Sequence, residues 1–81
     1  MAKTRKQIRN QELLNKIASR VKFLREKRNL TQEQLIFDSE IHIGRIESAK
    51  PNITISTLEF VCRHLGVSLE EFFKGDEFKD A

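Results

Sequence analysis

The sequence predicts an all-α fold, a compact bundle of about five helices, from two observations. Apolar residues recur at spacings of three and four, and no stretch alternates apolar and polar residues as a strand would. A typical helix start, in which a Ser or Thr cap follows an apolar residue and precedes Gln or Glu by three positions, occurs three times. With 81 residues the chain has room for one domain, which buries about 60% of its unfolded surface.

The first predicted helix follows a basic N-terminal arm, assigned to residues 1–12. The arm either docks on a polyanion or is the frayed start of the helix. From Leu13 the pattern becomes helical, and Asn29 is expected to end the helix in a left-handed conformation. One face carries an apolar stripe predicted to enter the core: Leu14, Ile17, Val21 and Leu24. The basic residues elsewhere on this helix are expected to face solvent or phosphate.

A short second helix is predicted by a complete start pattern. The Thr31 hydroxyl can accept a hydrogen bond from the first turn, and Gln34 can reach back to the Thr31 amide. Leu30 and Leu35 flank this start as a hydrophobic staple. The helix is expected to run from residue 32 to about 39.

A third helix, also short, is predicted after a brief break at residues 40–42. Ile43 and Ile46 are its apolar positions. It is expected to end by about Ala49, because Pro51 is barred from an ordinary helical interior. Two short helices with so tight a joint indicate a helix-turn-helix.

The fourth and fifth helices are predicted from the same start pattern. Ser56 is expected to cap the fourth helix with Glu59 closing the box, and Gly66 to end it in a left-handed turn. Its predicted buried residues are Leu58, Val61, Cys62 and Leu65. Ser68 and Glu71 repeat the pattern for a last short helix that finishes near residue 75. The helix-turn-helix domain is therefore assigned to residues 13–75, and an acidic C-terminal tail to residues 76–81.

The net charge of +3 hides a strong asymmetry. Residues 1–30 carry ten Lys or Arg against two acidic residues, a net +8, whereas residues 31–81 carry five against ten, a net −5. A basic half favours a polyanionic partner. A solvated helix surface explains the charge equally well.

Composition excludes several classes of function. No apolar run is long enough to cross a membrane and no signal peptide is visible, while the single Cys62 suits a reducing cytoplasm. His42 and His64 lack metal-ligand spacing, and there is no paired catalytic set or glycine-rich phosphate loop. We therefore expect no enzyme, no cofactor, no metal and no small-molecule ligand.

Four segments in a fixed order resemble one known family. They are LTQEQL at residues 30–35, GRIE at 44–47, NITISTL at 52–58 and LGVSLEEFF at 65–73. Together with the preceding helix they cover roughly residues 15–74, and they resemble the Cro and phage-repressor type of helix-turn-helix domain, also called the xenobiotic-response-element family. The resemblance implies a lambda-repressor-like bundle acting as a cytoplasmic, homodimeric transcriptional regulator, a repressor in its best-known form, that reads double-stranded DNA in the major groove.

The resemblance also implies which residues contact DNA. Gln32 would meet a phosphate at the start of the first motif helix, and Arg45 would read a guanine or meet a phosphate. The reading region also includes His42 and Gly44. The loop and the start of the fourth helix would meet phosphates through Lys50, Asn52, Thr54, Ser56 and Thr57. Each assignment has a structural rival, since Thr31, Ser56 and Ser68 also fit helix caps, and Glu47 fits a pairing with a nearby arginine or amide.

The sequence departs from the family pattern at the reading helix. Relatives usually place about three more residues between the apolar turn residue, here Ile41, and the pair Ile43 and Ile46, and those positions normally face the base edges. Three residues correspond to about 4.5 Å of helix. The apolar positions on both sides remain, so we expect the fold to survive. Three explanations stay open: a helix that begins earlier, near Glu40, a remodelled loop, or a chain lacking residues of the natural protein.

This departure favours an alternative function on the same scaffold, a helical protein-interaction module such as an antirepressor, antitoxin or adaptor. Its partner or dimer surface would use apolar residues outside the predicted core, namely Phe23, Phe37, Phe72, Phe73 and Phe78. The dimer face would be the last helix, with Leu69, Phe72 and Phe73, unless these residues belong to the core. The sequence does not reveal the operator or whether the effect is activation or repression.

Overall fold

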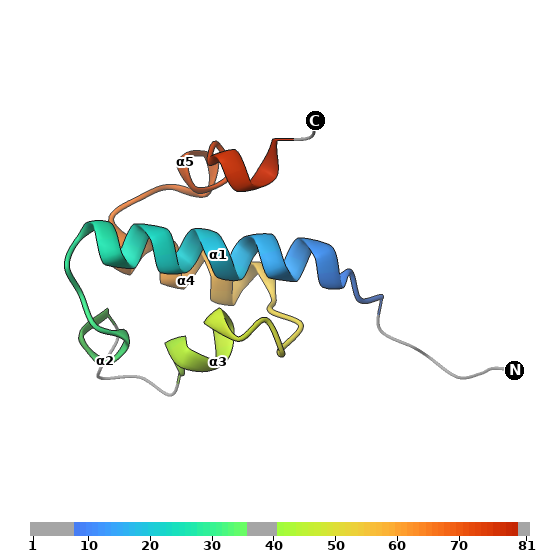
Figure 1. The fold of residues 1–81 in the computed structure, drawn as a ribbon, viewed down its shortest axis with the longest axis horizontal. Coiled ribbons are helices and arrows are strands. Elements are labelled where there is room, and N and C mark those ends of the chain that lie inside the picture. Colours follow the sequence, from blue (N-terminus) through green and yellow to red (C-terminus); the bar gives the residue numbers. More distant parts are fainter. Residues whose placement is uncertain (1–7, 36–40, 80–81) are drawn as a thin grey trace, which may run out of the picture.

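The computed structural model describes residues 8–35 and 41–79. The described part contains five α-helices and one 3-10 helix and no strand, so the all-α prediction is confirmed. In chain order they are α1 (Gln11–Lys27), α2 (Gln32–Leu35), α3 (Ile43–Glu47), α4 (Ile55–Leu65), α5 (Leu69–Phe72) and η1 (Asp76–Phe78). The long α1 runs through the middle of the molecule, with α2 and α3 on one side of it and α5 and η1 on the other (Figure 1).

Helix α1 begins two residues earlier than the apolar pattern indicates. The Asn10 side chain accepts a hydrogen bond from the Leu13 amide at 3.0 Å, so Asn10 caps the helix and Gln11 is its first residue. The assigned basic arm therefore contributes the first turn of α1, while its residues 1–7 lie outside the described part. At the other end Asn29 has a φ of 58°, which confirms the predicted left-handed stop.

Helix α2 starts as predicted. The Gln34 amide donates to Thr31 Oγ1 at 3.1 Å, and the Thr31 amide donates to Gln34 Oε1 at 2.8 Å, which completes the capping box. The predicted end of this helix near Ser39 and the beginning of the break at Glu40 lie outside the described residues. Helix α3 ends at Glu47, two residues before the predicted limit at Ala49.

The predicted cap of α4 is wrong. Thr54, not Ser56, is the N-cap: its hydroxyl accepts from the Thr57 amide at 3.1 Å. Only Ser56 has the glutamate that completes a capping box, but a start at Thr54 lengthens the helix and adds to its hydrogen bonds. Ile55, which a hydrophobic staple for the Ser56 cap would pack against Phe60, is 68% exposed. The cap of α5 by Ser68 is confirmed, with the Glu71 amide donating to its hydroxyl at 3.1 Å.

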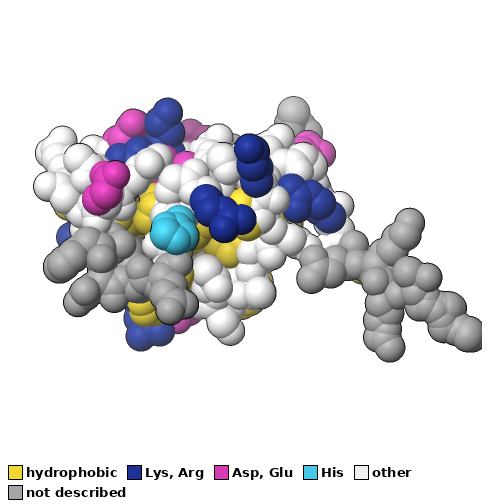
Figure 2. All heavy atoms as spheres, turned by 90° about the horizontal axis from the view of Figure 1, so that it is seen from below, with side chains coloured by type: hydrophobic (Ala, Val, Ile, Leu, Met, Phe, Trp, Pro, Cys, Tyr) yellow, Lys and Arg dark blue, Asp and Glu magenta, His cyan; other side chains and the backbone are white. Residues whose placement is uncertain are grey.

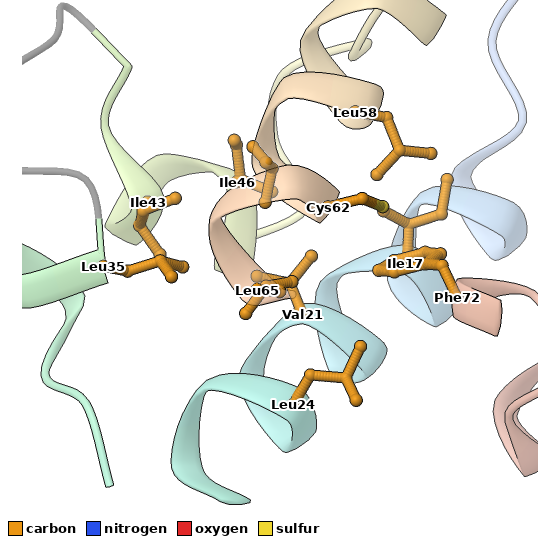
Figure 3. Close-up of a cluster of buried hydrophobic side chains, with 11 residues drawn as sticks. Ile17, Val21, Leu24, Leu35, Ile43, Ile46, Leu58, Cys62, Leu65 and Phe72 are labelled. Atoms are coloured by element: carbon orange, nitrogen blue, oxygen red, sulfur yellow. The ribbon is translucent and has the colours of Figure 1, made fainter. Parts of the chain in front are cut away.

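The core lies between α1 and α4 and takes one or two side chains from each other α-helix (Figure 3). All eight predicted stripe residues of α1 and α4 are buried. From the remaining helices come Leu35, Ile43, Ile46 and Phe72. Cys62 is a buried small side chain as predicted, and burial, with a smaller effect from Glu59, raises the pKa of its thiol to about 11. The thiol therefore stays protonated and unreactive at neutral pH.

The prediction that Phe72 is available to a partner is wrong. Phe72 is fully buried, with its ring centroid 5.2 Å from that of Phe73 and 5.7 Å from that of Phe78. The assigned acidic tail thus contributes η1 and the partly buried Phe78 to the fold; residues 80–81 lie outside the described part, as does Phe37. Phe23 and Phe73 are exposed.

Two basic side chains, one in α1 and one at its C-cap, bind the carboxyl ends of two other helices. Arg20 Nε donates to the carbonyl oxygen of Phe72 at 2.8 Å, and Arg28 Nη1 donates to that of His64 at 3.2 Å. A cation at a helix C-terminus meets the unpaired carbonyls and the negative end of the helix dipole. These charges hold α5 and α4 against α1. None of the described helices has the length and hydropathy needed to span a membrane.

Candidate nucleic-acid interface

An open groove of about 280 Å³ lies between α3 and the loop that leads into α4. We call it the α3 groove. Five of the nine residues predicted to contact DNA line it: His42, Arg45, Asn52, Thr54 and Thr57. The remaining lining is apolar, namely Ile41, Ile46, Pro51 and Ile53. The fold therefore gathers side chains that lie up to 16 positions apart in the sequence around one concave surface.

Two titratable side chains, Arg45 and His42, stand at this groove. Both residues are exposed, and neither side chain makes a hydrogen bond or ion pair within the described part of the chain. Lys50, beside the groove, is exposed in the same way. Figure 2 views this side of the molecule and shows Lys, Arg and His side chains across its middle, with acidic side chains toward its edges. None of the described residues that line the groove is acidic, so the charge of the described lining favours an anion.

The start of α4 adds hydrogen-bond donors. The Thr54 hydroxyl is engaged in the fold, because it accepts from the Thr57 amide and donates to Thr57 Oγ1 at 3.0 Å. The Ser56 hydroxyl, which the sequence pattern assigns to the cap, is exposed and without a described partner. The amides of Ile55 and Ser56 are the unpaired first donors of an 11-residue helix. A helix start of this kind binds phosphate readily.

The loop between α3 and α4 is tied to the root of the N-terminal arm. Gln11 Nε2 and Arg9 Nη2 both donate to the carbonyl oxygen of Ala49, at 2.9 and 3.3 Å, and Asn52 Nδ2 donates to the Ile8 carbonyl at 3.1 Å. Ala49 itself has a φ of 61°, which this pair of donors helps to hold. Sequence reasoning missed this contact, since nothing in the local pattern links residues about 40 positions apart.

Gln32 and Gly44 join the two motif helices instead of lining the groove. Gln32 Nε2 donates to Glu47 Oε1 at 3.0 Å. A Cβ at Gly44 would lie only 2.9 Å from Gln32 Oε1, so glycine permits the close approach of α2 and α3. Both residues therefore have a structural task in the free protein.

The carboxylate of Glu47 is turned away from the groove and paired with Arg25. Arg25 Nε donates to Glu47 Oε2 at 2.7 Å and Nη2 donates to Oε1 at 3.1 Å, while Nη1 donates to the Leu30 carbonyl at 2.7 Å. Only 10% of the Arg25 side chain and 6% of the Glu47 side chain are exposed. The hydrogen bond to Glu47 raises the pKa of Arg25 further above its usual range. The expected structural pairing of Glu47 is therefore confirmed.

The burial of Arg25 contradicts the expectation that every basic residue of the first helix faces solvent or phosphate. A sequence signal for its burial was present: Arg25 lies four residues after Val21 and one after Leu24, within the apolar stripe. The pair removes the one carboxylate of α3 from the surface that Arg45 and His42 share. It also fastens α1, the α1–α2 turn, α2 and α3 to one another.

The reading helix is short, as the sequence indicates. Helix α3 has five residues and begins at Ile43, with Ile41 and His42 outside it. Ile43 and Ile46, after the shortened region, are 3% and 7% exposed, and Ile41, before it, is partly buried against the same core. Because Glu47 also points inward, Arg45 is the only large side chain that α3 offers to solvent.

Comparison with known proteins gives one family match. A model described as helix-turn-helix matches residues 21–72, which is more than half of the chain and extends from the middle of α1 to the end of α5. No curated protein and no solved structure matches the chain. The matched segment contains both motif helices and all nine predicted contact residues.

Proposed function

The chain belongs to the Cro/C1-type helix-turn-helix family of DNA-binding regulators, and from this premise we propose that it is a cytoplasmic, sequence-specific transcriptional regulator that binds double-stranded DNA as a homodimer. The observation that carries the proposal is the α3 groove. Among the described residues it combines an arginine without an ion pair, an exposed histidine and the free donors of a helix start, with no acidic side chain in the lining.

The two sides of the groove suit different parts of a duplex. The Ser56 hydroxyl and the amides of Ile55 and Ser56 would hold one phosphate, with Lys50 beside them. This contact sets the position of the protein and carries no sequence information. Arg45 and His42, on the other side, would face the base edges, where a bidentate arginine contact selects guanine.

A protein-interaction module remains the second candidate, and the shortness of α3 favours it. A reading helix that offers one large side chain can distinguish few base pairs. In a protein-interaction module, the helical scaffold would bind a protein partner and would not select a DNA sequence. The two functions differ in how binding responds to sequence and to salt.

A salt titration of duplex binding separates these candidates. Fluorescence anisotropy would compare a random-sequence duplex with the pool that the protein selects from a random library. The proposal expects tighter binding to the selected pool and a logarithmic salt slope close to the number of phosphates contacted. Equal binding to both pools contradicts sequence-specific regulation, and no binding at moderate salt supports the protein-interaction module.

Arg45→Ala tests the reading residue directly. If Arg45 makes a bidentate contact, its removal should relax the preference at one operator position by about 1–3 kcal/mol while affinity for random DNA falls far less. The matched control is Arg63→Ala, which removes an exposed arginine that pairs with Glu59 on α4 and does not line the groove. An unchanged position-by-position preference in Arg45→Ala would remove Arg45 as the reader.

A further inference from the structure

We infer that a second, apolar groove is the surface on which a second copy of this chain docks; the inference rests on the proposed function and names its dimer interface. The groove has a volume of about 230 Å³ and lies between the start of α1, the loop before α4 and the end of α5. We call it the apolar groove. None of the described residues that line it is charged, although 33% of the chain is charged.

The exposed apolar side chains of the molecule gather at this groove. Among the described residues five large hydrophobic side chains are exposed, and four of them line it: Ile8, Leu13, Ile55 and Phe73, which are 92%, 41%, 68% and 39% exposed. The fifth, Phe23, lies elsewhere on α1. Side chains scattered singly need no explanation, but a contiguous group marks an interaction site.

The polar residues of the lining are already engaged. The Asn10 side chain caps α1, the Asn52 amide donates to the Ile8 carbonyl, and the Thr54 hydroxyl caps α4. A small ligand would need free polar groups to orient it and a pocket of about 300–1,000 Å³, and this groove offers neither. Nucleic acid would need cations, and the described lining contains none. The occupant must be an apolar protein surface.

A second copy satisfies this requirement, because its own groove and rim present the apolar side chains against which the groove of the first copy can pack. A two-fold pairing brings one patch against its own equivalent. Four side chains exposed to these extents offer on the order of 400 Å² of apolar surface, about half of the ~800 Å² that each partner buries in a standard interface. The polar rim would supply the rest, as in other interfaces.

The position of the groove favours a copy over an unrelated protein. Asn52, Ile53 and Thr54 line both the apolar groove and the α3 groove. A two-fold copy docked on the first would therefore place two α3 grooves side by side, as a regulator with two half-sites requires. The face predicted from the last helix is unsuitable, since Phe72 is fully buried; only Phe73 of that group reaches the groove as an exposed side chain.

Ile55→Glu tests the surface without disturbing the fold. Ile55 is the first residue of α4, where an acidic side chain is favoured by the helix dipole, and its side chain is largely in solvent. Placed at a two-fold interface, the two glutamates would be desolvated close together. Sedimentation equilibrium of the full chain without DNA should show a wild-type dimer and a dissociation constant about 30-fold higher or more in the variant.

Phe23→Gln is the matched control, because Phe23 is, among the described residues, the large exposed hydrophobic side chain that lies off the groove. It should sediment as the wild type does, and circular dichroism should show an unchanged helix content in both variants. A wild-type monomer at the highest soluble concentration overturns the inference, as does a variant dimer of unchanged strength or an equal weakening in Phe23→Gln. Dimers without DNA binding would refute only the proposed function, and selective binding by a monomer would refute only the surface.

Discussion

At the scale of single residues, Thr54 shows how a helix start is decided by two or three hydrogen bonds. Thr54→Ala should lower the free energy of unfolding by about 1 kcal/mol, because the Thr57 amide loses its acceptor. Ser56→Ala should change it by less than about 0.5 kcal/mol, since that hydroxyl has no described partner. Urea unfolding followed by circular dichroism measures both; a larger effect at Ser56 would restore it as the cap.

The caps also show what local sequence can and cannot determine. Thr31 with Gln34, Ser68 and the left-handed Asn29 are predictable because each depends on neighbours within four positions. The α4 start is ambiguous for the same reason. Thr54 and Ser56 are both good capping residues, although only Ser56 has a glutamate three positions later, and the choice depends on where the loop before α4 leaves the core.

At the scale of elements, the buried pair of Arg25 and Glu47 holds helices too short to be stable alone. Helices of four and five residues are far below the length at which an isolated helix forms. Glu47→Ala should lower the free energy of unfolding by about 3–5 kcal/mol, because it leaves a buried guanidinium without its partner.

Glu59→Ala is the control for this prediction. It breaks an ion pair of similar length, Arg63 Nη2 to Glu59 Oε1 at 3.0 Å, between side chains that are 68% and 43% exposed. A pair so exposed contributes about 1 kcal/mol or less. Chemical denaturation compares the two variants, and equal decreases in stability would mean that the Arg25 pair does not hold the motif helices.

The two pairs differ in what the sequence reveals of them. The pair on α4 is visible at a spacing of four residues. The pair of Arg25 and Glu47 spans 22 positions, so helical spacing can place Arg25 beside the apolar stripe but cannot name its partner. The sequence near Glu47 predicts only that its carboxylate pairs with some arginine or amide.

At the scale of the whole molecule, the fold is predictable and the grooves are not. Apolar spacing alone identifies the buried faces of α1 and α4, because each stripe is read within one helix. The α3 groove and the apolar groove depend on how helices meet, so Ile55 and Phe73, 18 positions apart, cannot be brought together from the sequence. The same reason explains why the sequence pattern assigns Phe72 to a surface although it lies in the core.

Part of the excess positive charge in the first 30 residues is engaged in contacts within the folded protein. Arg20, Arg25 and Arg28 are bound to helix ends or to a carboxylate. The charge left for a polyanion is therefore concentrated toward the N-terminus, whose root at Ile8 and Arg9 is fastened to the loop beside the α3 groove. Lys3, Arg5 and Lys6 precede that root and lie outside the described residues.

Replacing Lys3, Arg5, Lys6 and Arg9 by Gln tests whether this segment contacts DNA. Affinity for every duplex should fall, and the logarithmic salt slope should flatten by about 0.9 for each phosphate that the protein no longer neutralises, with base preference unchanged. The control removes four positive charges that line neither groove, Lys22, Lys27, Arg63 and Lys79. If net charge alone governs binding, both variants will flatten the slope equally. If the N-terminal segment contacts DNA beside the loop, the N-terminal variant will flatten the salt slope more than the control. The reason is that only phosphates within reach of the α3 groove release their counterions on binding.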